Sequence, residues 1–374
     1  MSNTFDITRR RFMGGLAAAG AATTVAATPL KYAFAKTLTV GFIYVGPRDD
    51  YGYNQAHAEG AAAVKKMSGV KVTEEENVPE TIAVQKTMES MINLDGAALL
   101  FPTSFGYYDP HILKLAPKYP DVTFMHAGGL WQPGQPKNAH SYFGYIDEAQ
   151  YIAGIVAGHT SKTKKLGFVA AKPIPQVLRN INAFTIAARS VDPSITTQVI
   201  FTGEWSMPVK EAEATNSLAD QGVDVVTCHV DGPKVVMETA ARRGMFISGY
   251  HASQAPLAPE KYLTGAEWDW PSLYTKFVSD YMAGKTIPNL VRGGLKEKIV
   301  KVSPYGPAVS EMARKHADEV KAKFLAGNVV LYKGPLKDNT GAMVIPAGKE
   351  LEQTNIELEK MNYLVEGVLG SVKA

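Results

Sequence analysis

Residues 164–169 read KKLGFV and echo the stretch TVGFI at residues 39–43. In each half, the glycine of this stretch lies 56 positions before a second apolar run, which begins near Ala97 and near Val223. Two further pairs of segments recur in the same order, residues 95–99 with 222–226 and residues 122–125 with 245–248. A single echo is expected by chance, but three in order at nearly equal spacing indicate two similarly wound halves.

Strand-like apolar runs alternate with helix-like stretches along both halves. Residues 38–45 and 97–101 are typical of buried strands, while residues 54–67 and 80–94 place apolar side chains on one helical face. This alternation predicts βαβ units around a parallel sheet, and the helical stretches have the length of right-handed crossovers. We therefore expect an α/β fold with two doubly wound lobes.

The N-terminus has the features of an export signal. Residues 8–13, TRRRFM, fit the twin-arginine pattern, and the uncharged stretch at 13–27 is too short to span a bilayer. Residues 33–35, AFA, offer a small-x-small cleavage site, so we expect a periplasmic mature chain that begins near Lys36. The alternative is a retained membrane anchor.

The charge balance excludes a nucleic-acid binder. The whole chain has 39 basic and 36 acidic residues. Residues 1–35 hold four of the basic residues and one acidic residue, so the mature chain keeps 35 of each. A protein that neutralises phosphates would retain a basic surplus.

The single cysteine, Cys228, lies in an apolar run and is interpreted as a buried structural thiol. It cannot form an internal disulfide, and no Cys/His spacing suggests zinc. We expect neither a metal nor a cofactor.

The loops that follow the strands supply the candidate contacts, because ligands of doubly wound sheets bind beyond the carboxyl ends of the strands. These loops are rich in flat rings, which offer stacking area at little entropic cost. They contain Tyr51, Tyr53, Phe105, Trp205, Tyr250, Trp268 and Trp270. Any one ring is explained by ordinary packing, but together they favour a slot for a planar ligand.

Catalysis is the weaker interpretation of these loops. His126 and His251 end matching strands, where they would form an acid/base pair or contact a ligand through hydrogen bonds. No nucleophile motif, phosphate-binding loop or zinc motif accompanies them. We therefore expect a binding protein rather than an enzyme.

Several segments, taken in order, resemble the basic membrane protein family, also called the purine nucleoside receptor A-like family, of ABC-transporter solute-binding proteins. The resemblance extends over the mature chain to about residue 335. Its most specific segments are residues 41–47, 52–54, 103–106, 120–124, 142–144, 165–170, 173–175 and 181–184, followed by Trp205 with Pro208 and Glu211, and by residues 263–264 with Trp270.

The resemblance implies a type I periplasmic-binding-protein fold with two lobes that close on a ligand across a hinge. The expected divisions are a signal at 1–35, lobe 1 at 36–161 with about 264–294, lobe 2 at 165–263 with about 295–335, and a C-terminal segment at 336–374 packed on the lobes. The rival is a single-lobed α/β enzyme with an appended region.

The resemblance also implies a purine held between two aromatic rings, which are Tyr53 and Trp205 in this chain. Asn54 follows the first ring, and Asp231 and Gly232 match an edge contact and a backbone contact. The full set of candidate ligand-binding residues is Tyr44, Tyr53, Asn54, Ser104, His126, Trp205, Asp231, Gly232, His251 and Trp268.

Departures from the family pattern bear on which purine is bound. Nucleoside-binding members have acidic residues at the places of Tyr44 and His126, another near His251 or Ser253, and a lysine at Trp268. Carboxylates suit ribose hydroxyl groups, and an indole fills volume that a sugar needs. We therefore expect a nucleobase or an oxidised purine rather than a nucleoside.

The expected function is solute capture for an ABC importer, with permease subunits as partners and a monomeric chain. The alternatives are a purine nucleoside-binding protein of the same kind, a periplasmic nucleoside-processing enzyme, and a sensor subunit that presents its ligand to a membrane receptor.

Replacing Arg9 and Arg10 together by lysine should trap the precursor inside the cell, because lysine keeps the charge but not the guanidinium geometry. Cell fractionation with immunodetection checks this. Mature protein that reaches the periplasm at the normal rate would contradict the twin-arginine assignment.

Overall fold

The computed structural model describes residues 37–372, so the predicted export signal lies outside the described residues. The first sheet has six parallel strands in the order β11-β5-β4-β3-β1-β2. Its strands are β1 Leu38–Ile43, β2 Val70–Glu75, β3 Ala97–Pro102, β4 Thr123–Ala127, β5 Ala139–Gly144 and β11 Leu290–Gly293. The switch in strand order lies between β1 and β3, where a doubly wound sheet binds its ligands.

The second sheet repeats this order with matching strands and adds one strand at its edge. The order is β12-β10-β9-β8-β6-β7-β17, and only the β12–β10 pair is antiparallel. Its strands are β6 Lys165–Ala170, β7 Thr196–Phe201, β8 Val225–His229, β9 Phe246–His251, β10 Tyr262–Trp268, β12 Val300–Val302 and β17 Val368–Leu369. The prediction of an α/β fold with two similarly wound halves is confirmed.

The glycines of the two repeated stretches explain why these stretches resemble each other in sequence. A Cβ on Gly41 would lie 2.5 Å from a Leu100 methyl group and 2.7 Å from the Met91 sulfur. A Cβ on Gly167 would lie 2.9 Å from a Leu218 methyl group. In both sheets the missing side chain lets neighbouring apolar groups pack directly onto the first strand.

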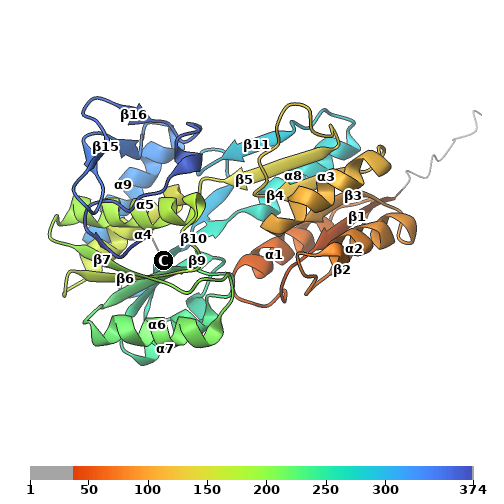
Figure 1. Cartoon of the computed structure of the whole chain (residues 1–374). Helices are drawn as coiled ribbons and strands as arrows, with labels where there is room; N and C mark the ends of the chain where they lie inside the picture. Colours follow the sequence, from red (N-terminus) through yellow and green to blue (C-terminus); the bar gives the residue numbers. More distant parts are fainter. Residues whose placement is uncertain (1–36, 373–374) are drawn as a thin grey trace, which may run out of the picture. The chain divides into compact units, whose positions relative to one another are not determined.

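Helices cover both faces of the second sheet. Figure 1 shows α6 and α7 on one side of β6 and β9, with α4 and α5 on the other. The main helices are α1 Tyr53–Lys65, α2 Ile82–Asn93, α4 Asp147–Thr160, α5 Pro175–Val191, α6 Pro208–Asp220, α7 Lys234–Arg242, α8 Trp270–Met282 and α9 Glu311–Leu325.

Short elements complete the described chain. They are the helical turns η1 Phe105–Tyr107, η2 Tyr108–Ile112, α3 Leu113–Leu115, η3 Ala116–Lys118, η4 Ala255–Leu257 and η5 Leu358–Lys360, and the strand pairs β13 Tyr332–Lys333 with β16 Glu350–Leu351 and β14 Leu336–Lys337 with β15 Met343–Ile345.

The connections between the two sheets differ from the expected divisions. Helix α4 was placed in lobe 1, which was expected to run to residue 161, yet it packs against α5, α9 and β10. Residues 264–268 were also placed with lobe 1, but they belong to β10 and pair with β9. The chain therefore first crosses near residue 145 and returns after residue 268, where α8 packs against α1.

Small residues on α4 account for its place beside the second sheet. A Cβ on Gly154 would lie 2.3 Å from the Phe184 carbonyl oxygen, and one on Gly158 would lie 3.0 Å from the Ala188 carbonyl oxygen. Only glycine at these positions allows α4 and α5 to approach so closely.

The C-terminal segment contacts the second sheet and α5. Strand β17 extends the sheet beside β7. The Asn182 amide donates to the Tyr363 carbonyl oxygen over 2.9 Å, and Arg179 forms an ion pair with Glu359 at 3.1 Å. These contacts tie residues 359–369 to α5 and to the edge of the second sheet.

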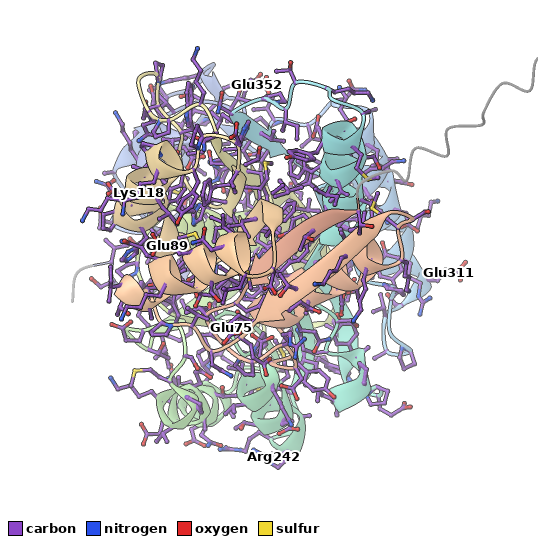
Figure 2. All side chains as sticks on the ribbon, turned by 90° about the vertical axis from the view of Figure 1, so that its right-hand side faces the viewer. Glu75, Glu89, Lys118, Arg242, Glu311 and Glu352 are labelled. Carbon is purple, nitrogen blue, oxygen red and sulfur yellow. The ribbon has the colours of Figure 1, made fainter. Side chains whose placement is uncertain are left out.

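Apolar side chains fill the space between the sheets and their helices, together with a few buried charged ones such as Asp147 and Arg179. Figure 2 shows Arg242, Glu311 and Glu352 at the periphery, and all three side chains are exposed. Among the described residues, no helix is both long enough and apolar enough to cross a membrane.

Gly154→Val should destabilise the protein by about 1–3 kcal/mol, because the new side chain collides with the α5 backbone. The free energy of unfolding from urea denaturation measures this. Ala62→Val, at an exposed position of α1, is the control for a valine in a helix without a collision, and helix propensity alone should limit its cost to about 0.7 kcal/mol. Equal effects of the two changes would contradict the close α4–α5 contact.

Candidate ligand-binding site

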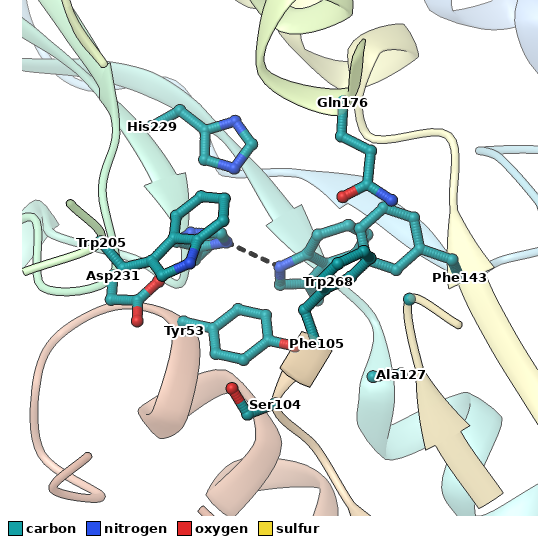
Figure 3. A pocket seen from close by; sticks show the side chains of 12 residues that line it. Tyr53, Ser104, Phe105, Ala127, Phe143, Gln176, Trp205, His229, Asp231 and Trp268 are labelled. Carbon is teal, nitrogen blue, oxygen red and sulfur yellow. Dashed lines mark hydrogen bonds between the residues drawn. The ribbon is translucent and has the colours of Figure 1, made fainter. Parts of the chain in front are cut away.

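Residues from both sheets line one cavity of about 490 Å³, which is partly open to solvent. They lie at or just beyond the carboxyl ends of strands, as Figure 3 shows. The lining residues are Tyr53, Ser104, Phe105, Ala127, Gly128, Phe143, Gln176, Trp205, His229, Asp231, His251 and Trp268. We call this cavity the aromatic pocket, because five of its wall residues are Tyr, Phe or Trp.

A backbone contact joins the two sides of the aromatic pocket. The Tyr53 amide donates to the Asp231 carbonyl oxygen over 2.9 Å. A Cβ on the preceding residue, Gly52, would lie 2.0 Å from that same oxygen, so this approach requires glycine. The side chain of Asp50 accepts from the amides of Gly52 and Gln55 and so holds the start of α1 in place.

The predicted stacking residues Tyr53 and Trp205 both line the pocket. The Tyr53 hydroxyl donates to the Thr103 carbonyl oxygen over 2.6 Å, which fixes the ring at the start of α1. The Trp205 carbonyl oxygen accepts from the Asp231 amide at 2.8 Å. In Figure 3 the two rings lie beside the Asp231 carboxylate.

Trp268 and His251 form a second aromatic wall. The Trp268 indole Nε1 donates to His251 Nδ1 over 2.8 Å, which is the dashed line in Figure 3. Trp268 also stacks on Trp270, with ring centroids 4.7 Å apart and planes 12° apart. The indole is 2% exposed and fills space beside Gly144, where a Cβ would lie 2.7 Å from the ring.

The titratable groups of the pocket are shifted toward their neutral forms. Burial lowers the pKa of His229 to about 3 and lowers the pKa of His251 well below its ordinary value. Desolvation, followed by the charges of Asp50 and Glu80, raises the pKa of Asp231 well above its ordinary value. Within residues 37–372 the Asp231 side chain makes no hydrogen bond or ion pair.

Six of the ten sequence-predicted residues line the aromatic pocket, namely Tyr53, Ser104, Trp205, Asp231, His251 and Trp268. Tyr44 does not, because its hydroxyl donates to Glu74 over 2.9 Å in a buried position. His126 does not either, because its Nε2 contacts the Ser104 carbonyl oxygen at 2.7 Å and its Nδ1 accepts from the Gly129 amide.

The other two predicted residues, Asn54 and Gly232, line a neighbouring cavity of about 960 Å³. We call it the acidic cavity, since Asp50, Glu80, Glu204 and Asp231 all line it. It shares Ser104, Trp205 and Asp231 with the aromatic pocket.

Most carboxylates of the acidic cavity already have partners. Asp50 accepts from backbone amides at the start of α1, and Glu80 accepts from the Ser104 hydroxyl and the Gly106 amide. Glu204 forms an ion pair with Lys172 at 2.7 Å. Asp231 is thus the carboxylate that has no such partner within the described residues.

Sequence reasoning missed Phe143, Gln176 and His229 as wall residues. His229 is the last residue of β8, and Phe143 is the last but one of β5, so both precede the loops that were searched. Gln176 is the second residue of α5. Extending the search by two residues into each strand would have included His229 and Phe143.

The chemistry available in this cavity is stacking, hydrogen bonding and one carboxylate. Among the residues that the structure describes, no group of three or more His, Cys, Asp or Glu side chains is placed to hold a metal ion. Cys228 is buried, and burial raises the pKa of its thiol.

Comparison with known families and proteins adds independent information. The family model described as "ABC transporter substrate-binding protein PnrA-like" matches residues 37–333. A purine-binding protein of Brucella abortus is 33% identical over 333 residues, which cover 88% of this chain and 93% of that protein.

Two further similarities are more distant. A Haloferax volcanii protein, named as a provisional ABC transporter glucose-binding protein, is 29% identical over 90% of this chain and 82% of its own length. The crystal structure of an ABC transporter solute-binding protein from Aeropyrum pernix superposes with a TM-score of 0.66 at 20% identity, covering 80% of this chain and 93% of that one. At this identity the superposition supports the fold alone.

Tyr53→Ala and Trp205→Ala should each weaken ligand binding by about 1–3 kcal/mol, the range seen for stacking of a base on an aromatic ring. Isothermal titration calorimetry measures the affinity, and circular dichroism checks the fold.

Tyr53→Phe is the matched control for the first of these variants, because it keeps the ring and loses only the hydroxyl contact with Thr103. It should retain most of the affinity. Unchanged affinity in both alanine variants would remove these two rings from the site.

Proposed function

Because this chain belongs to the PnrA-like family of ABC transporter substrate-binding proteins, we propose that it captures a purine nucleobase in the periplasm and delivers it to an ABC importer. The observation that carries this proposal is the aromatic pocket, in which flat rings surround the Asp231 carboxyl group, which has no hydrogen-bond or ion-pair partner within residues 37–372. A purine offers two faces for stacking, and its edge carries both N–H groups and ring nitrogens that pair with the Asp231 carboxyl group in either of its protonation states.

The name of the Brucella relative supports a purine ligand for this chain. The Haloferax relative bears the name of a sugar-binding protein, but five aromatic wall residues suit a planar heterocycle better than a hexose alone. We therefore retain the purine as the proposed ligand class.

The proposal favours a free base over a nucleoside for a steric and a chemical reason. Trp268 occupies space at the wall of the aromatic pocket, where it is fixed by His251 and Trp270. Buried ribose hydroxyl groups need free acceptors, and the carboxylates of Glu80 and Glu204 are already engaged.

Tyr44 and His126 contribute less to this preference than the sequence suggested. Both side chains are satisfied by protein groups and do not line the aromatic pocket. The preference for a base therefore rests on Trp268 and on the carboxylates of Glu80 and Glu204, which already have partners.

A nucleoside is the second candidate, and the acidic cavity favours it. This cavity adjoins the aromatic pocket through Asp231 and is rich in acceptor oxygens. A nucleoside whose base lay in the aromatic pocket would place its ribose in the acidic cavity. The ribose would have to displace hydrogen bonds that exist there.

The proposed role requires no chemistry on the ligand. His126 cannot act with His251 as an acid/base pair, because both His126 nitrogens already contact backbone groups. We propose that the chain only binds and releases its ligand, and that permease subunits in the inner membrane are its partners. Twin-arginine export and cleavage near Ala35 belong to the same proposal.

The protein purified without denaturation should carry a purine that mass spectrometry identifies. After the ligand is removed, calorimetry with hypoxanthine and inosine should show tighter binding of the base. The reason is that Trp268 and the engaged carboxylates leave the ribose poorly accommodated.

An inosine affinity at least tenfold higher than that of hypoxanthine, about 1.4 kcal/mol, would overturn the preference for a base. It would leave purine capture standing. Absence of binding to every purine base and nucleoside would overturn the proposed function itself.

A further inference from the structure

The loop before α1 contacts the second sheet beside the aromatic pocket. The Gln254 side-chain amide donates to the Tyr51 carbonyl oxygen over 2.5 Å, and the Tyr53 amide donates to the Asp231 carbonyl oxygen over 2.9 Å. The Lys234 ammonium group lies over the Tyr51 ring, 5.6 Å from its centre. Tyr51, Lys234 and Gln254 do not line the pocket, so part of this contact joins the two sheets without the ligand between them.

The loop on the side of the first sheet is shaped by its own residues. The Asp50 carboxylate accepts from the amides of Gly52, Asn54 and Gln55 at 2.8, 3.0 and 2.9 Å. Within this loop Tyr51 has a φ of 56°, in the left-handed region that residues other than glycine rarely adopt. Because the bonds of Asp50 lie within residues 50–55, the loop keeps its form without the second sheet.

The loop after β9 is likewise shaped from within, by the buried side chain of Gln254. Its Oε1 accepts from the Tyr250 amide at 2.9 Å, and its Nε2 donates to the carbonyl oxygens of Tyr250 and Ala252 at 2.8 and 2.7 Å. The carbonyl oxygen of Tyr51 is a third acceptor for the same nitrogen, which has only two hydrogens. Withdrawal of Tyr51 therefore leaves both hydrogens of Gln254 with partners.

Gly52 permits the approach of these two loops. A Cβ at this position would lie 2.0 Å from the Asp231 carbonyl oxygen and 2.3 Å from Pro233 Cδ, and the third nearest heavy atom also belongs to Asp231. These separations are far inside van der Waals contact. None of the three atoms belongs to the first sheet, so the need for glycine comes from the second sheet.

The contact is a non-covalent link between the sheets. The chain itself passes between them at residues 145–146, at residue 269 and at residues 294–299. The contact of residues 50–53 with the loops after β8 and β9 lies outside all three connections. It is therefore a contact that can break when two lobes turn about their connecting segments.

We propose, on the basis of the proposed purine-binding function, that this contact is a reversible latch that determines how long the ligand stays bound. Residues 50–53 dock on Asp231 and Gln254 when the sheets close on the ligand. Both loops are preformed, so docking costs little conformational entropy. Gly52 and Gln254 are positioning residues, because they line no part of the pocket and act by holding Tyr53 and Asp231 in place.

The test measures dissociation of whichever of hypoxanthine and adenine binds wild-type protein more tightly, by stopped-flow displacement on the full mature chain. Gly52→Ala should raise the dissociation rate at least tenfold, because the new Cβ separates the two loops and breaks both hydrogen bonds. The association rate should change about threefold or less, since the open form is unaltered.

Two further variants accompany this measurement. Gln254→Leu keeps a similar volume, removes the bond to Tyr51 and should also raise the dissociation rate. Ala62→Val, at an exposed position of α1 outside the latch, is the control and should leave both rates unchanged. Circular dichroism checks the fold of each variant.

A second measurement uses the unaltered protein. Hydrogen exchange followed by NMR should show the Tyr53 amide protected with ligand and exchanging at least tenfold faster without it, because water reaches this amide when the latch opens. The Gln55 amide, which bonds to Asp50 within the same loop, should stay protected in both states. Equal protection of the Tyr53 amide with and without ligand would overturn the inference.

The outcomes separate the latch from the function on which it rests. A dissociation rate in Gly52→Ala within threefold of the wild-type rate would overturn the latch and leave purine capture intact. Failure of wild-type protein to bind any purine base or nucleoside would overturn both.

Discussion

The contact between the start of α1 and the loop after β8 is the constraint on which the site depends. Gly52 has no side chain, so the Tyr53 amide reaches the Asp231 carbonyl oxygen at 2.9 Å. A hydrogen bond from the Gln254 amide to the Tyr51 carbonyl oxygen, 2.5 Å long, lies beside it. Because these bonds join segments that follow strands of different sheets, they place the rings of one sheet against the carboxylate of the other.

The sequence allowed the architecture to be predicted because the repeat has a physical cause. Gly41 and Gly167 recur since each first strand must accept close apolar neighbours. The place of α4 was not predictable in the same way. A helix rich in Ala and Gly is compatible with either sheet, and its place beside the second follows from its packing against α5, α9 and β10, which includes the close approach of Gly154 to Phe184.

The site was predictable to the level of strand ends but not to the level of single side chains. His126 and Ala127 are consecutive residues of β4, so their side chains point to opposite faces, and Ala127 is the one that lines the pocket. His229 and Asp231 are two residues apart and both line it. Sequence alone does not show which of the alternating side chains of a strand face the pocket. It also does not show that the Tyr44 hydroxyl bonds to Glu74 on the adjacent strand.

The stacked arrangement of Trp268 and Trp270 has a spectroscopic consequence. The chain contains four tryptophans. Trp205 and Trp268 line the pocket, and Trp270 stacks directly behind Trp268. Three of the four indoles therefore lie at the aromatic pocket or directly behind its wall. A heterocycle stacked in this pocket would quench their emission by electron or energy transfer, which would make the protein's own fluorescence a reporter of its occupancy.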